Sequence, residues 1–147
     1  MTYEGFRPEI TELHAPFWEA LRRHELVVQE CAACSRLRFI PSEMCPACYS
    51  PEAVWAMVSG RGTVYTFSVV HRAPTPAYQA DAPYVVAYIE LDEGPRVPAR
   101  LVDVDPADVV VGMPVTVVFD DVDPELTLHR FRPTVEERTA DALGPAV

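Results

Sequence analysis

The stretch Cys31-Ala-Ala-Cys34, followed after ten residues by Cys45-Pro-Ala-Cys48, decides the fold and contains all four cysteines of the chain. Each Cys-x-x-Cys pair supplies two thiolates from one tight turn, and the spacer is long enough for the two turns to face each other around one tetrahedral ion. The spacer is shorter than in many four-cysteine sites, but a short ribbon hairpin closes it. We therefore predict a structural Zn(Cys)4 site with Cys31, Cys34, Cys45 and Cys48 as its ligands.

Two other uses of these cysteines stay open. Two disulfides would require an oxidising compartment, but residues 1–9 have neither the basic start nor the apolar run of a secretory signal. We therefore expect a reducing, cytoplasmic location. One pair could also act as a redox dithiol, although two matched pairs at ribbon spacing favour structure. The Cys-Pro-x-Cys half is typical of a rubredoxin knuckle, so iron is a second metal that suits the site.

The composition limits the fold and the partners. The chain has 147 residues, of which 49 % are hydrophobic, and this suits one domain or two small modules with a real core. The formal charge is −10, and nucleic-acid affinity depends largely on basic side chains, so we expect no nucleic-acid partner. The sequence contains no run of apolar residues long enough for a membrane span. All twelve basic residues are arginine, whose guanidinium makes bidentate contacts with phosphate and carboxylate.

A short helix is predicted after a partly ordered arm over residues 1–13. It begins at Ala15, with Pro16 in its first turn. Its apolar face has the spacing i, i+3, i+4 and i+7, and is formed by Phe17, Ala20, Leu21 and His24. The adjacent Trp18 points about 100° away from Phe17, so the two aromatics face different directions. Either one packs on the core and the other on a partner, or both pack on the core.

Residues 26–30 and 37–40 are predicted as the strands of a hairpin with the metal at its tip, which is the shape of a zinc ribbon. Arg36 and Arg38 flank Leu37 and should share one side of the second strand. They either balance the negative charge of a zinc with four thiolates or bind a phosphate. Residues 53–58, which include Trp55, are predicted to lead into the next module.

From residue 59 onward the pattern is almost entirely that of β-strands. Gly60 and Gly62 flank Arg61 in a turn or bulge that matches no phosphate-binding loop. Runs rich in β-branched and aromatic residues follow at 63–71, 84–91, 96–102, 115–119 and 127–131. Five short antiparallel strands are typical of a small closed barrel of the oligomer-binding (OB) type.

The connections between these strands differ in character. Residues 72–83 hold three prolines and Tyr78, and predict a long, stiff loop of the kind that often carries function. Residues 103–114 predict a turn with one helical turn. The acidic residues before the last strand predict a solvated turn rather than a calcium loop, since EF-hand spacing is missing; they are Asp120, Asp121, Asp123 and Glu125.

The predicted fold is therefore mainly β, with a short N-terminal helix, a zinc ribbon and then a five-stranded OB-fold barrel. We divide the chain into an N-terminal arm and helix at 1–25, the ribbon at 26–58, the barrel at 59–133 and a flexible tail at 134–147.

The order of these parts resembles the DUF35 family over residues 15–133. The resemblance rests on Ala-Pro-Phe-Trp-Glu-Ala-Leu, Leu-Val-Val-Gln-Glu-Cys, the two knuckles, Ser-Gly-Arg-Gly-Thr-Val-Tyr-Thr-Phe-Ser-Val-Val-His-Arg, Pro-Tyr-Val-Val-Ala and Gly-Met-Pro-Val-Thr-Val-Val-Phe. The family's knuckles often carry glycine after the second cysteine, where this chain has Ser35 and Tyr49. These two residues alter the turn of each knuckle, but the four cysteine ligands are unchanged.

The resemblance implies a function. Members of the family pair a rubredoxin-like zinc ribbon with an OB fold, and are commonly encoded with thiolase-like or lipid-transfer-type enzymes that act on acyl-CoA thioesters. Several are obligate, non-catalytic subunits of steroid side-chain hydratase or aldolase assemblies, or of archaeal thiolase and hydroxymethylglutaryl-CoA synthase complexes. The resemblance therefore implies an accessory subunit in steroid or lipid catabolism, with the acyl-CoA held by the complex.

The residues themselves show no catalytic set, because the thiols are committed and no Ser-His-Asp order or open metal site is visible. The pair His71-Arg72 remains, either as acid–base and anion-binding groups or as a strand-end pair that holds the loop. We expect acyl-CoA or partner contacts from Arg36, Arg38, Arg61, His71 and Arg72, and interface contacts from Phe17, Trp18, Trp55 and Tyr78. The alternative function is a single-stranded nucleic-acid-binding module, which the net charge opposes.

Overall fold

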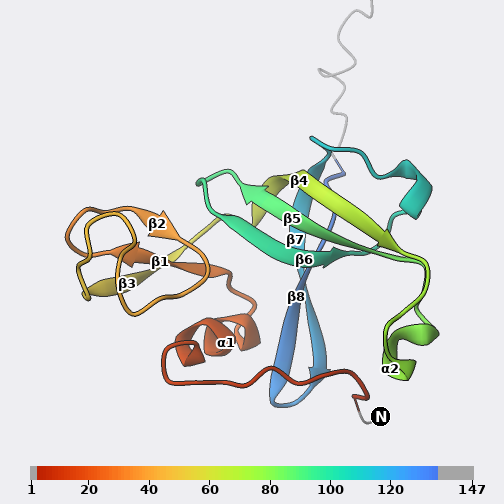
Figure 1. Cartoon of the computed structure of the whole chain (residues 1–147), viewed down its shortest axis with the longest axis horizontal. Coiled ribbons are helices and arrows are strands. Elements are labelled where there is room, and N and C mark those ends of the chain that lie inside the picture. The colour runs from red at the N-terminus through yellow and green to blue at the C-terminus, as the bar shows by residue number, and fades with distance from the viewer. Residues whose placement is uncertain (1–2, 136–147) are drawn as a thin grey trace, which may run out of the picture.

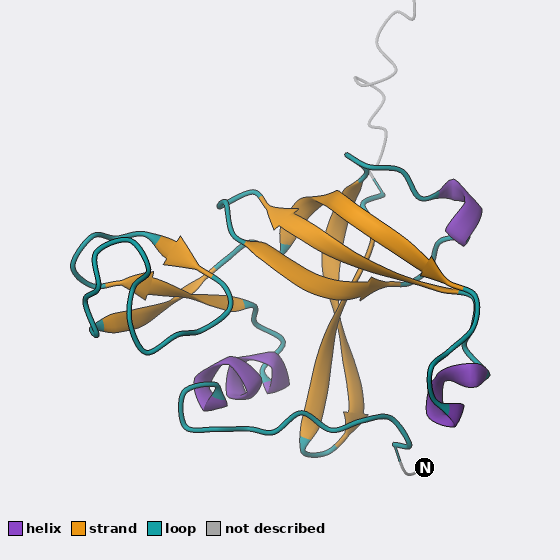
Figure 2. Cartoon of the chain, in the orientation of Figure 1, coloured by secondary structure: helices purple, strands orange, loops and turns teal. Residues whose placement is uncertain are grey.

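Two β-sheets and a helix that packs against both form the fold, as the computed structural model shows for residues 3–135 (Figure 1). The elements are α1 (Ala15–Arg22), β1 (Val27–Cys31), β2 (Leu37–Arg38), β3 (Ala53–Met57), β4 (Arg61–Val70), α2 (Pro76–Gln79), β5 (Tyr84–Leu91), β6 (Arg96–Leu101), the 3-10 turn η1 (Pro106–Asp108), β7 (Pro114–Asp123) and β8 (Leu126–Pro133). The prediction of a mainly β fold with a ribbon and a five-stranded barrel is confirmed (Figure 2).

Helix α1 begins and ends as the sequence indicates. Pro16 lies in the first turn, and the residues that face the core are Phe17, Ala20 and Leu21. The expectation that His24 continues this apolar face was wrong, because His24 has a φ of 58° and lies beyond the helix end. Its ring stacks on Phe119 instead, and its Nε2 lies 2.9 Å from the Asp121 carboxylate.

The ribbon is a three-stranded antiparallel sheet with the order β2-β1-β3. Strand β3 pairs with the whole of β1, and Trp55 lies opposite Gln29. Strand β2 ends at Arg38, two residues earlier than predicted, because Gln29 Oε1 accepts hydrogen bonds from the Arg38 side chain and from the Ser42 N–H. These bonds fold the chain back at Ser42 in place of a longer strand.

The barrel closes in the order β4-β5-β6-β8-β7. All pairs are antiparallel except β6 with β8, which run parallel with Arg100 opposite Arg130 and Leu101 opposite Phe131. The expectation of an entirely antiparallel barrel was therefore wrong. The strand order is the reason: β8 returns beside β6 after pairing with β7, and this closure brings together two strands of the same direction.

The acidic segment was predicted as a turn, but most of it belongs to β7. Strand β7 runs to Asp123, so only Pro124 and Glu125 separate it from β8. The Asp120 carboxylate accepts from Arg130 Nε at 2.8 Å. Asp123 forms an ion pair with Arg7 of the N-terminal arm. Acidic side chains that have basic partners in this way can extend a hairpin rather than end it.

The predicted loop at 72–83 contains the short helix α2, whereas the helical turn predicted in 103–114 is present as η1. Residues 3–13 form no regular element. They run across the end of the β7–β8 hairpin toward α2 (Figure 1), where the Phe6 N–H donates to the Tyr78 hydroxyl at 2.8 Å. Most of the predicted tail, residues 136–147, lies outside the described residues.

One hydrophobic core joins helix, ribbon and barrel. Phe17 is 3 % exposed, and its ring lies 5.3 Å from that of Phe39 in the ribbon and 5.5 Å from that of His129 in β8. Val28 of β1 and Ile89 of β5 are fully buried in the same cluster. No helix within residues 3–135 is long and apolar enough to cross a membrane.

Candidate metal centre and surface residues

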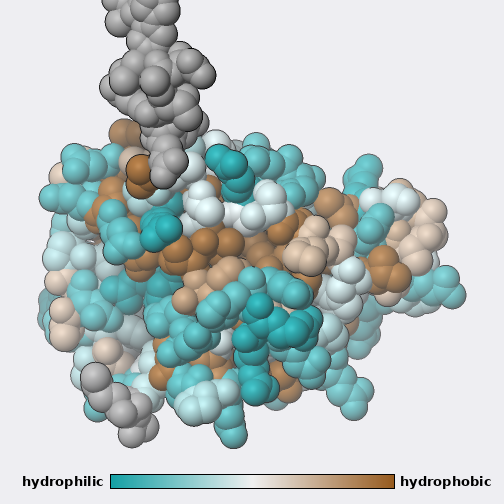
Figure 3. Space-filling model, turned by 180° about the vertical axis from the view of Figure 1, so that it is seen from behind, coloured by the Kyte–Doolittle hydropathy of each residue, from teal (hydrophilic) through white to brown (hydrophobic). Residues whose placement is uncertain are grey.

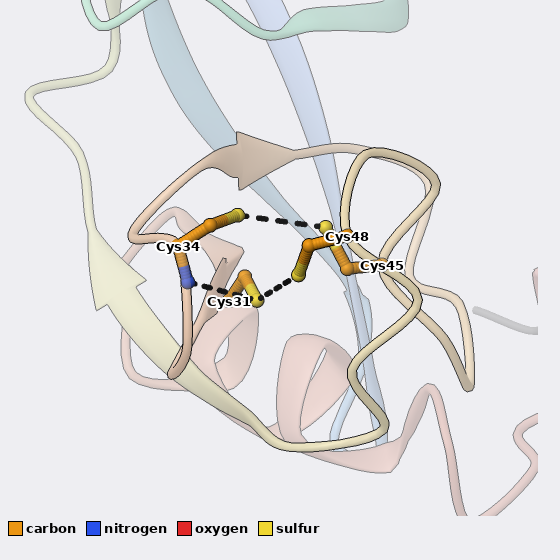
Figure 4. A group of neighbouring side chains, drawn as sticks. All are labelled: Cys31, Cys34, Cys45 and Cys48. Carbon is orange, nitrogen blue, oxygen red and sulfur yellow. Dashed lines mark hydrogen bonds between the residues drawn. The ribbon is translucent and has the colours of Figure 1, made fainter.

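The two knuckles have the same local geometry. The Ser35 N–H donates to Cys31 O at 2.9 Å, and in the second knuckle the Tyr49 N–H donates to Cys45 O at 2.8 Å. The N–H of the first cysteine is also satisfied in each knuckle: Cys31 donates to Arg36 O, and Cys45 donates to Ser50 O. Each chain reversal therefore presents its two sulfurs to the other knuckle, and Figure 4 shows all four side chains pointing into one space.

The sulfur positions fit a single tetrahedral ion. Cys31 Sγ lies 3.5 Å from Cys48 Sγ, Cys34 Sγ lies 3.7 Å from Cys45 Sγ, and all four sulfurs lie within 4.8 Å of one another. A zinc bound at about 2.3 Å holds its thiolates about 3.8 Å apart, whereas a disulfide needs about 2.05 Å. All four cysteines are free thiols, so the disulfide alternative is excluded in this structure and the four-cysteine metal site is supported.

The thiols of this site differ in their affinity for protons. A hydrogen bond from the Cys34 backbone lowers the pKa of Cys31 to about 6, and the Cys48 backbone lowers the pKa of Cys45 in the same way. The Ser50 backbone acts to lower the pKa of Cys48, but the Cys31 thiol and burial outweigh it and raise this pKa to about 12. Metal binding must therefore displace protons, and zinc affinity should decrease as the pH falls.

The residue after each second cysteine has an unusual backbone. Ser35 has a φ of 64° and Tyr49 a φ of 65°, the left-handed region in which glycine is favoured. The turn is therefore retained in spite of the side chains. A zinc site of this kind fixes the conformation through its ligands, so we attribute the tolerance of Ser35 and Tyr49 to the metal.

Arg36 and Arg38 do not form a pair. Arg38 is 8 % exposed, and its guanidinium donates to Gln29 Oε1 at 2.9 Å and to Ser42 O at 3.1 Å. Arg36 precedes β2 and is exposed. The expectation of a shared basic face was therefore wrong. Arg38 stabilises the ribbon from inside, and its burial leaves it no surface for a phosphate.

The four predicted interface aromatics fall into different environments. Phe17 belongs to the core, which excludes it from a surface contact. Trp55 is half-buried against the same core. Trp18 and Tyr78 line one hollow of about 440 Å³ below the N-terminal arm, together with Arg100. Sequence reasoning missed this hollow, because the arm and the barrel that enclose it are far apart along the chain.

The remaining predicted contact residues are all exposed but lie apart. His71 and Arg72 follow the end of β4, and Arg72 lines a small hollow with Pro74 and Gln79 of the α2 loop. Arg61 is the first residue of β4, at the opposite end of the strand. Within residues 3–135, no side-chain hydrogen bond or ion pair joins His71 or Arg72 to the loop.

Two histidines have the polar partners that catalysis would require, but in the wrong arrangement. His14 Nδ1 lies 2.8 Å from Thr11 Oγ1 at the start of α1, without a carboxylate to orient it in the described part of the chain. In the second group, Asp121 accepts from Thr127 Oγ1 and contacts His24, so the carboxylate lies between hydroxyl and imidazole. The first group therefore lacks the carboxylate that would orient the imidazole, and in the second group the carboxylate separates the hydroxyl from the imidazole.

Comparisons with known proteins agree with this architecture. Residues 18–53 match the family model described as "ChsH2, rubredoxin-like zinc ribbon domain", and residues 55–120 match "ChsH2, C-terminal OB-fold domain". The structure is similar to a solved chain titled "Ltp2-ChsH2(DUF35) aldolase", with a TM-score of 0.81 and 43 % identity, over 88 % of this chain and 100 % of that chain.

Two sequence relatives define the family. A "DUF35 domain-containing scaffold protein" of Methanocaldococcus jannaschii is 42 % identical over 104 residues, 69 % of this chain and 73 % of the relative. A "Probable enoyl-CoA hydratase alpha subunit" of Thermomonospora curvata is 43 % identical over 131 residues, 89 % of this chain. The chain spans only 40 % of that hydratase subunit's length.

The fold and the metal site define a zinc ribbon joined to an OB-fold barrel. With the relatives above, the chain belongs to the DUF35 family, as its resemblance to that family indicates.

Proposed function

We propose that this chain is a non-catalytic subunit that binds and completes a thiolase-like or lipid-transfer-type enzyme acting on acyl-CoA thioesters. The observation that carries the proposal is the match to the "Ltp2-ChsH2(DUF35) aldolase" chain, which this chain covers completely. The reaction we infer is an aldol cleavage or condensation in steroid side-chain or lipid catabolism, with the nucleophile or base supplied by the partner. A cytoplasmic location suits the reduced thiols that the metal site requires.

The chemistry of the site supports a structural role for the metal. Cys31, Cys34, Cys45 and Cys48 would hold the zinc, and four thiolates leave no open position for substrate or water. When bound, the zinc supplies a crosslink between the two knuckles rather than a Lewis acid. Iron fits the same four sulfurs, and a metal analysis of the purified protein would distinguish the two.

The ribbon offers apolar surface for a partner. Among the described residues, the large hydrophobic side chains that the ribbon leaves exposed are Ile40, Met44, Tyr49, Val54 and Met57. Figure 3 shows apolar side chains at the surface of the ribbon and in a band across the back of the barrel. Clusters of exposed apolar side chains such as these are typical of protein interfaces.

The decisive experiment compares turnover of an acyl-CoA by the candidate partner with and without this chain, together with the size of the mixture. We expect a stable complex, no turnover by this chain alone, and a higher rate for the complex. Equal rates and no complex, across the thiolase-like proteins encoded nearby, would refute the proposal. Salt-sensitive binding of single-stranded oligonucleotides would then favour the nucleic-acid alternative.

A matched pair of variants tests the ribbon as the docking surface. Met57 is 67 % exposed at the end of β3, and Val111 is 66 % exposed in the loop before β7. Met57→Asp should weaken the complex at least about tenfold, because it introduces an unpaired charge into an apolar interface. Val111→Asp should bind the partner like the parent. If the two variants bind equally well, the ribbon is not the docking surface.

A further inference from the structure

Three polar side chains form a row across the barrel where β4, β7 and β8 lie side by side. Arg61 of β4 lies opposite Thr116 of β7, and Thr116 lies opposite Arg132 of β8. Directly opposed residues of antiparallel strands project to the same face, with Cβ atoms about 5 Å apart. Two guanidinium groups therefore flank one hydroxyl on the same surface.

The row lies at a hollow of about 380 Å³ that is lined by donors. Its lining consists of Ser59, Arg61, Thr116, Arg132, Pro133, Thr134 and Val135, without a carboxylate from the described chain. The hydroxyls of Thr116 and Thr134 are 2.6 Å apart. At the edge of the hollow, the Glu93 carboxylate accepts from the Ser59 N–H at 2.7 Å.

The charge of this hollow stands out because most other arginines are neutralised. Among residues 3–135, ion pairs with carboxylates are formed by Arg7, Arg23, Arg96, Arg100 and Arg130. Arg38 is buried in the ribbon, where its Nε donates to Gln29 Oε1. Arg61 and Arg132 are both exposed and have no ion-pair partner in this part of the chain, yet they line the same hollow. Two like charges placed together on a protein of charge −10 favour an anion.

The backbone fixes the position of Arg61. Gly60 has a φ of 80°, and its carbonyl accepts from the Val117 N–H at 2.7 Å. A Cβ at Gly62 would lie 2.4 Å from Glu90 O of β5. Both glycines are therefore needed for the close approach of β4 to its neighbours, and they hold Arg61 in place before any ligand binds.

We propose that Arg61, Thr116 and Arg132 bind a phosphate group of a CoA thioester. Arginine pairs recognise phosphate through bidentate, charge-assisted hydrogen bonds, and the hydroxyl between them adds a donor. The identity of the ligand rests on the proposed function, whereas the anion site rests on the geometry alone. The site extends the single expected contact at Arg61 to two residues that sequence reasoning missed.

Calorimetric titration of the full chain with CoA at low salt tests the site. We expect measurable binding that weakens about tenfold in Arg61→Gln and again in Arg132→Gln, since each removes charged hydrogen bonds. Arg22→Gln is the matched control, because Arg22 is exposed at the end of α1 and does not line the hollow. It should bind CoA like the parent. Loss of affinity for 3′-dephospho-CoA would assign the 3′-phosphate to the site, and retained affinity would assign the diphosphate.

Two outcomes would overturn the proposal. One is that pantetheine, which lacks the 3′-phosphate and the diphosphate, binds as tightly as CoA. The other is that the Arg61→Gln and Arg22→Gln variants bind CoA equally well. The size of the complex with the partner is a separate measurement. If the arginine variants assemble normally but bind CoA more weakly, the site is supported. If the parent chain binds CoA but forms no complex, only the proposed function is refuted.

Discussion

Ser35 and Tyr49 show how a single backbone angle connects sequence, metal and stability. Both follow the second cysteine of a knuckle and adopt φ values of 64° and 65°. A side chain in this region is strained, and glycine at the same position is not. The sequence difference from related knuckles therefore has a defined physical cost, which the metal offsets.

The first prediction is that Ser35→Gly and Tyr49→Gly each stabilise the zinc-loaded protein by about 0.5–1 kcal/mol, because relief of strain exceeds the added entropy of the unfolded chain. Chemical denaturation at saturating zinc measures the change. Ala33→Gly is the control, since Ala33 lies in the first knuckle without a positive φ, and it should destabilise the protein. A loss of stability in all three variants would contradict the argument.

At the scale of residues, the sequence predicted the metal ligands because their spacing is local. It did not predict the role of Arg38, which depends on Gln29 across the sheet and on Ser42 after the turn. Nor did it predict Thr116 and Arg132 beside Arg61, because strand register brings them together from distant parts of the chain.

Among the secondary-structure elements, strand β8 is tied to helix α1 through a half-buried histidine, His129. His129 Nε2 lies 2.9 Å from Pro98 O, and Nδ1 is buried without a hydrogen-bond partner among residues 3–135. The Phe17 ring packs edge-on against the imidazole. Burial lowers the pKa of His129, with a smaller contribution from the charge of Arg130.

The second prediction follows from the sign of this shift. An unfolded histidine takes up a proton near pH 6.5, whereas the folded His129 resists protonation to a lower pH. Between these pH values the unfolded state binds more protons, so the free energy of unfolding should decrease as the pH falls below about 6.5.

His129→Gln should flatten this pH dependence, and His71→Gln, which changes an exposed histidine, should keep it. Urea unfolding from about pH 5.5 to 8 at saturating zinc makes the comparison. Equal slopes in the parent and His129→Gln would refute the assignment.

The number and type of the strands could be predicted because period-two patterns and turn residues are local signals. Strand ends were less predictable where polar residues pair across strands. Asp120 and Asp123 look like turn residues in the sequence, but Arg130 and Arg7 partner them in the fold and the hairpin extends. The parallel pairing of β6 with β8 is likewise a property of closure, which no single segment encodes.

The whole molecule combines two sheets in one core, with α1 as the shared element. Phe17 contacts Phe39 of the ribbon and His129 of the barrel, so ribbon and barrel are coupled through one side chain. The buried apolar side chains of the ribbon, such as Val28, belong to the core that it shares with the barrel, and its two knuckles depend on the metal for a crosslink. The barrel has a closed ring of hydrogen-bonded strands. The two parts should therefore differ in their response to metal loss.

The third prediction is that removal of zinc opens the ribbon and leaves the barrel folded. Chelation, or Cys45→Ser, should abolish metal binding and accelerate amide hydrogen exchange in β1, β3 and α1, because their packing depends on the closed knuckles. Amides of β5, whose Ile89 is fully buried, should stay protected.

The same samples should lose affinity for the partner, since Met57 and the other exposed apolar side chains belong to the ribbon. Protein returned to zinc should regain both properties. Uniform exchange across ribbon and barrel would show one cooperative unit, and unchanged exchange would show that the metal is not structural.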